Sequence, residues 1–288
     1  MSGTFLAIDW GTTNRRVYRI VDGVVAATER DAKGVTATKD FPAELAMIRQ
    51  RFGDLPVLMA GMVGSTIGWR EAAYVPAPAG LAALGDQLLR IDDRTAIVPG
   101  VSYRDDRRAD VMRGEEVQLL GAIAAAMAPA DAMLVQPGTH CKWVEMRGGE
   151  IARFTTAMTG ELFALLRHHG ILAAQLGAEV TAGPAFLEGV RDGAARDLAA
   201  SLFGIRAAKL LGLRDDADAA SFASGVLIGS DVAARIAATD FDHAHILADP
   251  QLGTLYTAAI EAQGRSATLV DSHAAFVAGI TRLGDFLP

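Results

Sequence analysis

The 288-residue sequence contains a single cysteine, Cys141, and only four lysines, so its basic charge comes mainly from arginine. One cysteine excludes an internal disulfide and a cysteine-rich metal site. No apolar run reaches the roughly 18 residues that a membrane-spanning helix needs. The first residues also lack the basic start and apolar stretch of a secretion signal, so a cytoplasmic location is expected.

Several motifs that would point to other enzyme classes are absent. The G-x-x-x-x-G-K-[ST] pattern of P-loop proteins does not occur, and no G-x-G-x-x-G follows an expected strand. The H-R-D and D-F-G motifs of protein kinases and the G-x-S-x-G motif of hydrolases are missing as well. No H-E-x-x-H or comparable spacing predicts a metal site, and we interpret His168 and His169 as ordinary residues of a helix surface.

The charge balance disfavours some partners. The chain carries 27 basic and 34 acidic residues, for a net charge of −7. General binding to nucleic acid or to a membrane surface is therefore not expected. Hydrophobic residues make up 51% and charged residues 21% of the chain, which is typical of a soluble globular protein with a full core. The length fits one large domain or two smaller ones.

The order of expected elements predicts two α/β halves. Three strands are expected in the first thirty residues, with a hairpin turn at Asp22-Gly23, and three more follow residue 130, with a turn at Gly148-Gly149. The stretch "DVMRGEEVQLLGAIAAAM" predicts one helix that is capped by Asp110 and ends at Pro129. We place the boundary there, between an N-terminal lobe of residues 1–129 and a C-terminal lobe of residues 130–288. Further helices are expected around residues 159–176, 184–192, 196–212 and 219–238.

An internal similarity links the two halves. When residues 134–152 are placed on residues 7–25, Gly138 falls on Gly11 and Thr139 falls on Thr12. Both copies then read as an apolar strand, a Gly-Thr turn, a second strand and a Gly-containing hairpin. This shared order predicts a duplicated unit, with the two copies facing each other across a cleft.

The Gly-Thr turns suit phosphate groups. Glycine lets backbone N–H groups approach a ligand, and threonine hydroxyls add donors. Asp9 precedes the first turn, whereas the uncharged Gln136 precedes the second. A lone carboxylate beside a phosphate turn is a natural partner for Mg2+. Taken singly, each turn could equally be a plain hairpin turn with Asp9 as its capping acid. Taken as a pair, they favour a nucleotide.

Longer motifs resemble one family in particular. "AIDWGTTN" resembles the first phosphate motif of the superfamily that includes hexokinase, actin and heat-shock chaperones. "AIDWGTTNRR", "MAGMVGSTIGW", "VMRGEEVQLLGA", "PGTHCKWV", "MTGELFALL" and "SGVLIGSD" occur in the order seen in 2-keto-3-deoxygalactonate kinases. The resemblance implies a two-lobed actin/hexokinase-like (ribonuclease H-like) α/β fold with duplicated β-sheet domains. It also implies ATP- and Mg2+-dependent phosphorylation of the 6-hydroxyl of 2-dehydro-3-deoxy-D-galactonate, in galactonate catabolism.

The resemblance assigns nucleotide-binding roles by position. Asp9 is expected to hold Mg2+, and Arg15 and Lys142 occupy equivalent places just after the two turns. The adenosine motif is less clear, because Asp249-Pro250 stands where the superfamily usually has a glycine pair. The expected nucleotide-binding residues are Asp9, Gly11, Thr12, Thr13, Asn14, Arg15, Gly138, Thr139, His140 and Lys142.

Three carboxylates could accept the proton of the attacking hydroxyl. Asp110 is expected where the helix begins, and Glu115 and Glu116 flank its first turns. The general base should lie in the cleft, within hydrogen-bond reach of the hydroxyl. Asp110 and Glu115 rank equally, and Glu116 ranks third. The alternatives are a plain helix cap for Asp110 and a solvated helix face for the glutamates.

The resemblance implies a keto acid as substrate, whose carboxylate would need a cation. Arg113 could form a bidentate pair with it, and Arg15, Arg16 and Lys142 are alternatives. The loop "GMVGSTIGW" is expected to cover the substrate, with an ordinary surface loop as the alternative. Glu161 in "TGELF" opens a helix that could hold an anion or simply be capped. The remaining expected substrate residues are Gly64, Ser65, Trp69 and Glu161.

Two other functions stay open at this point. One is a kinase for another sugar or sugar acid, such as 2-keto-3-deoxygluconate. The other is an actin-like nucleotide-binding regulator, which would not need the carboxylate cluster of "RGEE". The apolar C-terminal half could also hide a homodimer face, although large helical cores have the same composition.

Overall fold

The computed structural model describes residues 3–195 and 197–287, which form two compact units. Unit 1 contains the chain up to Asp131, the segment Glu145–Phe154 and the segment from Ser272 onward. Unit 2 contains Ala132–Val144 and Thr155–Asp271. The predicted boundary at residue 129 lies close to the end of the first segment of unit 1, but the prediction did not include the two later segments that also belong to unit 1.

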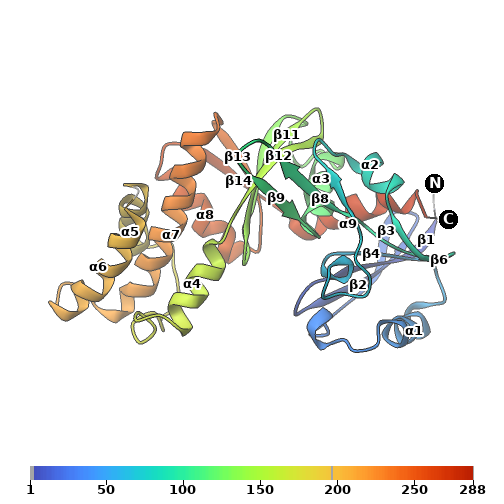
Figure 1. Cartoon of the computed structure of the whole chain (residues 1–288), viewed down its shortest axis with the longest axis horizontal. Coiled ribbons are helices and arrows are strands. Elements are labelled where there is room, and N and C mark those ends of the chain that lie inside the picture. The colour runs from blue at the N-terminus through green and yellow to red at the C-terminus, as the bar shows by residue number, and fades with distance from the viewer. Residues whose placement is uncertain (1–2, 196, 288) are drawn as a thin grey trace. The chain divides into compact units, whose positions relative to one another are not determined.

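A six-stranded sheet forms the centre of unit 1, in the order β3-β2-β1-β4-β7-β6 (Figure 1). A smaller sheet has the order β5-β8-β9. The strands are β1 (Thr4–Trp10), β2 (Arg15–Val21), β3 (Val24–Asp31), β4 (Val57–Ala60), β5 (Tyr74–Pro76), β6 (Leu89–Asp92), β7 (Thr95–Ile97), β8 (Gly100–Arg104) and β9 (Ala109–Met112). The helices are α1 (Phe41–Phe52), α2 (Leu81–Asp86), α3 (Glu115–Ala124) and α9 (Ser272–Gly284), with short 3-10 turns at Val35–Ala37 and Met62–Gly64.

A five-stranded sheet has the order β12-β11-β10-β13-β14, with most of its residues in unit 2. Its strands are β10 (Ala132–Gln136), β11 (Cys141–Arg147), β12 (Glu150–Ala157), β13 (His243–Leu247) and β14 (Ser266–Val270). The helices are α4 (Thr159–His168), α5 (Pro184–Ala194), α6 (Leu198–Leu210), α7 (Asp216–Ala238) and α8 (Pro250–Glu261). These bounds match the expected helices closely, except that α4 ends earlier and residue 196 lies outside the described residues.

The two large sheets share their topology. In each, three consecutive strands are neighbours, and the first of them also pairs with a later strand in parallel. A further parallel strand follows in both, β7 beside β4 and β14 beside β13. The turn between β2 and β3 has positive φ at Asp22 and Gly23, as a two-residue hairpin requires. The predicted α/β fold with duplicated β-sheet domains is confirmed.

The segment before α3 differs from the sequence-based expectation. Residues 109–112 form strand β9 rather than the first turn of a helix, and Asp110 pairs with Tyr103 of β8. The hairpin between β8 and β9 is closed by Asp105, whose carboxylate accepts hydrogen bonds from the backbone of Arg107 and Arg108. Gly114, at φ +105°, then separates the strand from α3, so Asp110 cannot cap the helix. The predicted helix start was therefore wrong.

Two helix pairs pack at very short distance within their units. In unit 1, a Cβ on Gly121 of α3 would collide with the backbone of α9 at Ala275. In unit 2, a Cβ on Gly225 of α7 would collide with the carbonyl of Phe186 in α5.

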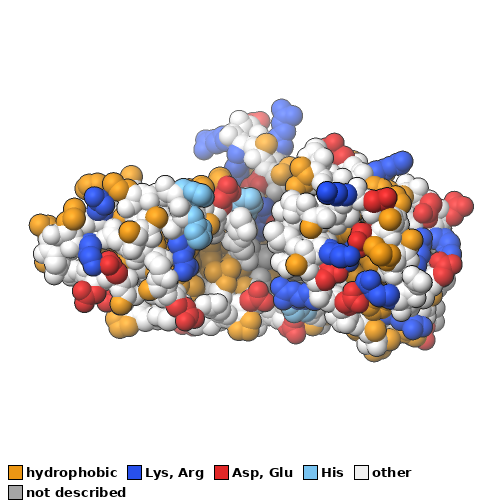
Figure 2. Space-filling view, turned by 90° about the horizontal axis from the view of Figure 1, so that it is seen from below, with side chains coloured by type: hydrophobic (Ala, Val, Ile, Leu, Met, Phe, Trp, Pro, Cys, Tyr) orange, Lys and Arg blue, Asp and Glu red, His pale blue; other side chains and the backbone are white. Residues whose placement is uncertain are grey.

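Helix α7 is the one described helix that is long and apolar enough to cross a membrane. Because 78% of its apolar window is buried within the protein, it is a core helix. Acidic and basic side chains are interspersed on the face shown in Figure 2.

Candidate active site

The first Gly-Thr turn follows β1 and is tightly supported. The N–H of Gly11 donates to the carbonyl of Asn14 at 2.9 Å, which closes the turn. Thr36 donates two hydrogen bonds to the carbonyl of Thr12, one from its backbone N–H at 3.2 Å and one from its hydroxyl at 2.8 Å. The side chains of Thr12 and Thr13 are left exposed. These contacts hold the backbone of the turn in place, with the two threonine side chains exposed.

Asp9 lies at the end of β1, between Arg16 of β2 and Ala60 of β4. Burial raises the pKa of its carboxyl to about 6, with the positive charge of Arg16 opposing this and the negative charge of Glu115 adding to it. Sequence reasoning named Arg16 only as an alternative substrate cation. Its Nη1 also contacts the ring of His273 at the start of α9. The negative charge of Glu115 thus acts on Asp9, with Arg16 beside it, an arrangement that a bound cation would stabilise.

Close approach of two glycines brings the "RGEE" turn to Asp9. Gly61 follows β4 at φ +95°, and its Cβ, if present, would lie 3.5 Å from Oδ1 of Asp9. A Cβ on Gly114 would lie 3.0 Å from the Cα of Gly61. Because both backbones have positive φ and no room for a side chain, only glycine fits either position without strain. Neither glycine was predicted as a site residue, although Gly61 directly follows an apolar strand.

The two glutamates after this turn have different environments. Glu115 is half-buried, and its Oε2 accepts a hydrogen bond from the backbone N–H of Arg113 at 3.0 Å. Glu116 is fully buried, and both its oxygens accept from the N–H of Gly114, at 2.9 and 2.7 Å. Burial, helped by the charge of Glu115, raises the pKa of Glu116 to about 8. Glu116 is therefore protonated at neutral pH and cannot act as a general base, which leaves Glu115 as the better candidate.

Arg113 is a buried cation with unused donors. Its Nη2 donates to the carbonyl of Ala72 at 2.7 Å, and its guanidinium carbon lies 4.3 Å from the ring centroid of Tyr74. Its Nε and Nη1 are buried without a hydrogen-bond partner among the described residues. A Cβ on Gly64 would come within 3.0 Å of Nη1, so this glycine keeps space beside the guanidinium. Buried donors of this kind call for an acceptor, and an anion fits best.

Asp110, Ser65 and Arg15 are placed differently from expectation. Asp110 is half-buried in β9 and accepts a hydrogen bond from the N–H of Val111, away from any helix start. Ser65 donates to the carbonyl of Met62 within its own turn. Arg15 is buried and pairs with Asp31 at 2.6 Å and Glu44 at 3.1 Å. These contacts give Arg15 a structural role within unit 1.

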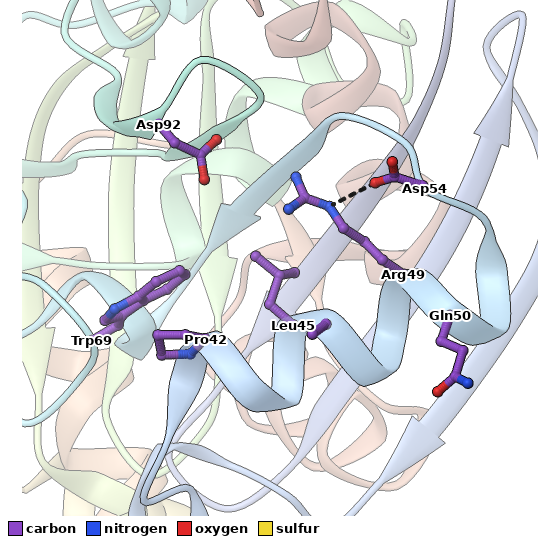
Figure 3. Close-up of a pocket in the computed structure, with 8 residues that line it drawn as sticks. Pro42, Leu45, Arg49, Gln50, Asp54, Trp69 and Asp92 are labelled. Carbon is purple, nitrogen blue, oxygen red and sulfur yellow. Dashed lines mark ion pairs between the residues drawn. The ribbon is translucent and has the colours of Figure 1, made fainter.

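Trp69 lines a surface groove of about 580 Å3 beside α1 (Figure 3). Its ring stacks on Phe41 with centroids 6.1 Å apart and an interplanar angle of 4°. Across the groove, Arg49 and Asp54 form an ion pair at 3.8 Å. In this structure Trp69 thus anchors its loop to α1, and neither Arg113 nor Glu115 lines the groove.

The second Gly-Thr turn lies in unit 2 and is supported by α4. The N–H of Glu161 donates to the carbonyl of Thr139 at 2.9 Å, and the carboxylate of Glu161 lies 2.6 Å from Nε2 of His140. A Cβ on Gly160 would collide with the carbonyl of Gly138, so α4 begins directly against the turn. Glu161 therefore serves the phosphate turn, where sequence reasoning had assigned it to the substrate. Lys142, in β11, is buried.

A small cavity of about 70 Å3 opens beside this second turn. It is lined by Gly138 and Gly160, by Ser224 and Leu227 of α7, and by Leu252 and Tyr256 of α8, all within unit 2. Apolar walls with a few polar groups are typical of ligand pockets, which are usually several times larger than this cavity. The cavity supplies candidate residues for a pocket that the sequence left unspecified.

The described residues contain no group of three or more His, Cys, Asp or Glu side chains that could by itself hold a metal ion. Mg2+ in kinases is usually bound by one or two carboxylates together with phosphate oxygens and waters. The carboxylate of Asp9, raised in pKa and acted on by the charge of Glu115, fits that mode of binding.

The duplicated sheets, each with a Gly-Thr turn after its first strand, place the protein in the actin/hexokinase-like fold class. The activator of 2-hydroxyisocaproyl-CoA dehydratase from Clostridium difficile, solved with bound ADPNP, is similar in fold only. Its structure has a TM-score of 0.53 and 10% identity, covering 99% of this chain and 96% of that chain.

The chain belongs to the 2-keto-3-deoxy-galactonokinase family, whose profile matches residues 9–283. It is 37% identical to the 2-dehydro-3-deoxygalactonokinase of Escherichia coli K12 over 286 residues, which covers 97% of both proteins. A Sinorhizobium meliloti protein, provisionally described as a 2-dehydro-3-deoxygalactonokinase, has a crystal structure with a TM-score of 0.92 and 37% identity, covering 97% of this chain and 98% of that one. The resemblance seen in the motifs is confirmed.

Proposed function

We propose that this protein is an ATP-dependent kinase that phosphorylates 2-keto-3-deoxygalactonate at its 6-hydroxyl. The observation that supports this most directly is in unit 1, where the charge of Glu115 raises the pKa of Asp9 and the neighbouring Arg113 has two buried donor atoms without a partner among the described residues. Family membership supports the substrate class. Such a reaction draws on cytoplasmic ATP, so we expect the protein in the cytoplasm.

Glu115 is the proposed proton acceptor. In the reaction the hydroxyl oxygen forms a bond to the γ-phosphorus, the bond from that phosphorus to the bridging oxygen breaks, and ADP leaves. The hydroxyl proton passes to the carboxylate of Glu115. Phosphoryl transfer needs mainly alignment and charge neutralisation, and a positioned base adds about 10²–10⁴-fold. Glu116, protonated and turned to the N–H of Gly114, instead holds the shape of the turn.

Arg113 is the proposed partner of the substrate carboxylate. Nη2 already donates to Ala72, so Nε and Nη1 are the groups of Arg113 whose N–H donors remain for a carboxylate. Tyr74 and the carbonyl of Ala72 hold the guanidinium in place, and Gly64 leaves room beside Nη1. A keto acid would therefore be oriented through its charged end.

The phosphate turns are the proposed binding sites for ATP. Backbone N–H groups and the exposed hydroxyls of Thr12 and Thr13 would contact phosphate oxygens in unit 1, and Thr139 with His140 would do so in unit 2. Mg2+, held on the protein side by Asp9, would neutralise phosphate charge when bound.

The test is an ADP-release assay with 2-keto-3-deoxygalactonate, 2-keto-3-deoxygluconate, galactonate and galactose as acceptors, with and without EDTA. We expect the galactonate-derived keto acid to give the highest kcat/KM and EDTA to abolish turnover. Mass spectrometry of the product should show one added phosphate, and NMR should place it at carbon 6. Higher kcat/KM with the gluconate-derived acid would replace the proposed substrate. ATP turnover that no acceptor stimulates would overturn the kinase proposal.

A further inference from the structure

The motif "SGVLIGSD" in α7 ends at a buried acid, Asp231, that the proposed reaction does not use. The side chain of Asp231 is 4% exposed, and the nearest cation, Nε of Arg235, lies 3.8 Å away. Burial raises the pKa of this carboxyl to about 6. A buried carboxyl costs free energy unless its hydrogen bonds are satisfied, so its partners indicate what it does.

The partners of Asp231 belong to the strand that leaves the second phosphate turn. Nε1 of Trp143 donates to Oδ2 of Asp231 at 2.9 Å, in the interior of unit 2. The thiol of Cys141, the first residue of β11, hydrogen-bonds with Asp231 as well. Asp231 thus holds two alternate residues of β11, and His140 of the turn directly precedes the first of them.

The hydrogen bonds continue from Cys141 to the other side of the turn. Cys141 also hydrogen-bonds with the hydroxyl of Tyr256 in α8, and that hydroxyl lies 2.9 Å from Oγ1 of Thr159. Thr159 is the first residue of α4, and the next residue, Gly160, packs against Gly138. A continuous buried chain of polar groups therefore runs from Asp231 to both sides of the second phosphate turn.

We propose that Asp231 is a positioning residue for nucleotide binding, which fixes the second phosphate turn through Cys141 and Trp143 on one side and through Tyr256 and Thr159 on the other. The nature of the ligand rests on the proposed function. Tyr256 and Thr159 line the cavity beside the turn, whereas Asp231 does not. Asp231 therefore acts through its neighbours and does not touch the ligand.

The first experiment compares Asp231→Asn with the wild type. Asparagine has nearly the same shape and its carbonyl oxygen can still accept from Trp143, but it removes the charged acceptor that Cys141 shares. We expect the Kd of ADP and the KM of ATP to rise about tenfold, a value typical of losing one hydrogen bond to a charged group. The KM of the sugar acid should stay within twofold, because Arg113 and Glu115 belong to unit 1.

A matched control separates positioning from packing. Val232 is the next residue in α7 and is fully buried in the same core cluster. Val232→Ala should lower the Tm but leave the Kd of ADP unchanged. If Val232→Ala weakens ADP binding as much as Asp231→Asn does, the effect is general loosening of the core and the proposal is wrong.

A second variant keeps the proposal testable if Asp231→Asn does not fold. Cys141→Ala removes the thiol that links Asp231 to Tyr256. Like Asp231→Asn, it should raise the Kd of ADP, by a few fold. Adding Tyr256→Phe to Cys141→Ala should then raise the Kd of ADP little further, because both substitutions interrupt the same series of buried polar contacts. Folded variants with the ADP affinity of the wild type would overturn the proposal.

Calorimetric titration with ADP alone makes the outcome independent of the sugar-acid reaction. If the wild type binds ADP but phosphorylates no acceptor, the proposed function fails and the positioning role can still be measured. If the wild type is an active kinase and Asp231→Asn leaves ADP binding intact, only the positioning role fails.

Discussion

Replacing Glu116 with glutamine should change how stability depends on pH. The carboxyl is fully buried, and its pKa in the folded protein is about 8, against 4.5 for an ordinary glutamate. Between these values the unfolded chain releases the proton and the folded protein keeps it. Stability of the wild type therefore falls as pH rises through this range. Glu116→Gln removes this loss, because the amide does not ionise.

The magnitude follows from the two pKa values. An interval of 3.5 units corresponds to about 5 kcal/mol in total, of which about 4 kcal/mol should develop between pH 5 and pH 8.5. Glutamine keeps one acceptor oxygen, but its NH2 group replaces the second oxygen that lies near the N–H of Gly114, so a pH-independent loss of about 1 kcal/mol is also expected. The variant should be slightly less stable than the wild type at pH 5 and clearly more stable at pH 8.5.

The assay is urea unfolding of both proteins at half-unit steps from pH 5 to pH 8.5, without nucleotide. Asp9 and Asp231, with pKa values of about 6, titrate in both proteins and cancel in the difference. The interval from pH 6.5 to pH 8 reports mainly on Glu116, since both aspartates are largely ionised there. Stability curves that run parallel across the whole range would refute the idea that Glu116 is held protonated by burial.

Three further substitutions test the roles in unit 1. Asp9→Asn should reduce kcat at least about 100-fold with Mg2+-ATP, and unchanged turnover would remove Asp9 from the metal site. Glu115→Gln should reduce kcat by about 10²–10⁴-fold while the Kd of ADP stays constant; a loss under tenfold would exclude it as the base. Arg113→Lys keeps the charge but loses the planar donors, so the KM of the keto acid should rise about 10- to 100-fold with the KM of ATP unaffected. Equal changes in both KM values would argue for a general structural role.

The sequence predicted the fold because the repeated unit is local. An apolar strand, a Gly-Thr turn and a second strand are each set by neighbouring residues, and two copies are visible without any knowledge of long-range packing. The start of α3 failed for the opposite reason. Asp110 looks like a helix cap, but β8 pairs with residues 109–112, and a distant strand cannot be read from local propensity.

The candidate site was predicted in part. The residues of both turns, Arg113 and Glu115 could be named from motifs, but the sequence could not separate Glu115 from Glu116. Their difference comes from burial, which depends on how the turn at Gly114 packs against Gly61. The alignment of the two repeats suggested a nucleotide-binding role for Arg15, because it occupies the same position as Lys142. In the structure, its side chain instead pairs with Asp31 and Glu44, which the alignment could not show.

The return of α9 to unit 1 has a consequence for biosynthesis. Phe276 stacks on Tyr18 with ring centroids 5.5 Å apart, and Gly279 packs against α3, so β2 and α3 both need residues that are synthesised after unit 2. Unit 2 is complete once Asp271 has left the ribosome, before the segment from Ser272 onward that unit 1 needs. Unit 1, whose first residues are made before unit 2, should therefore reach its native state after unit 2.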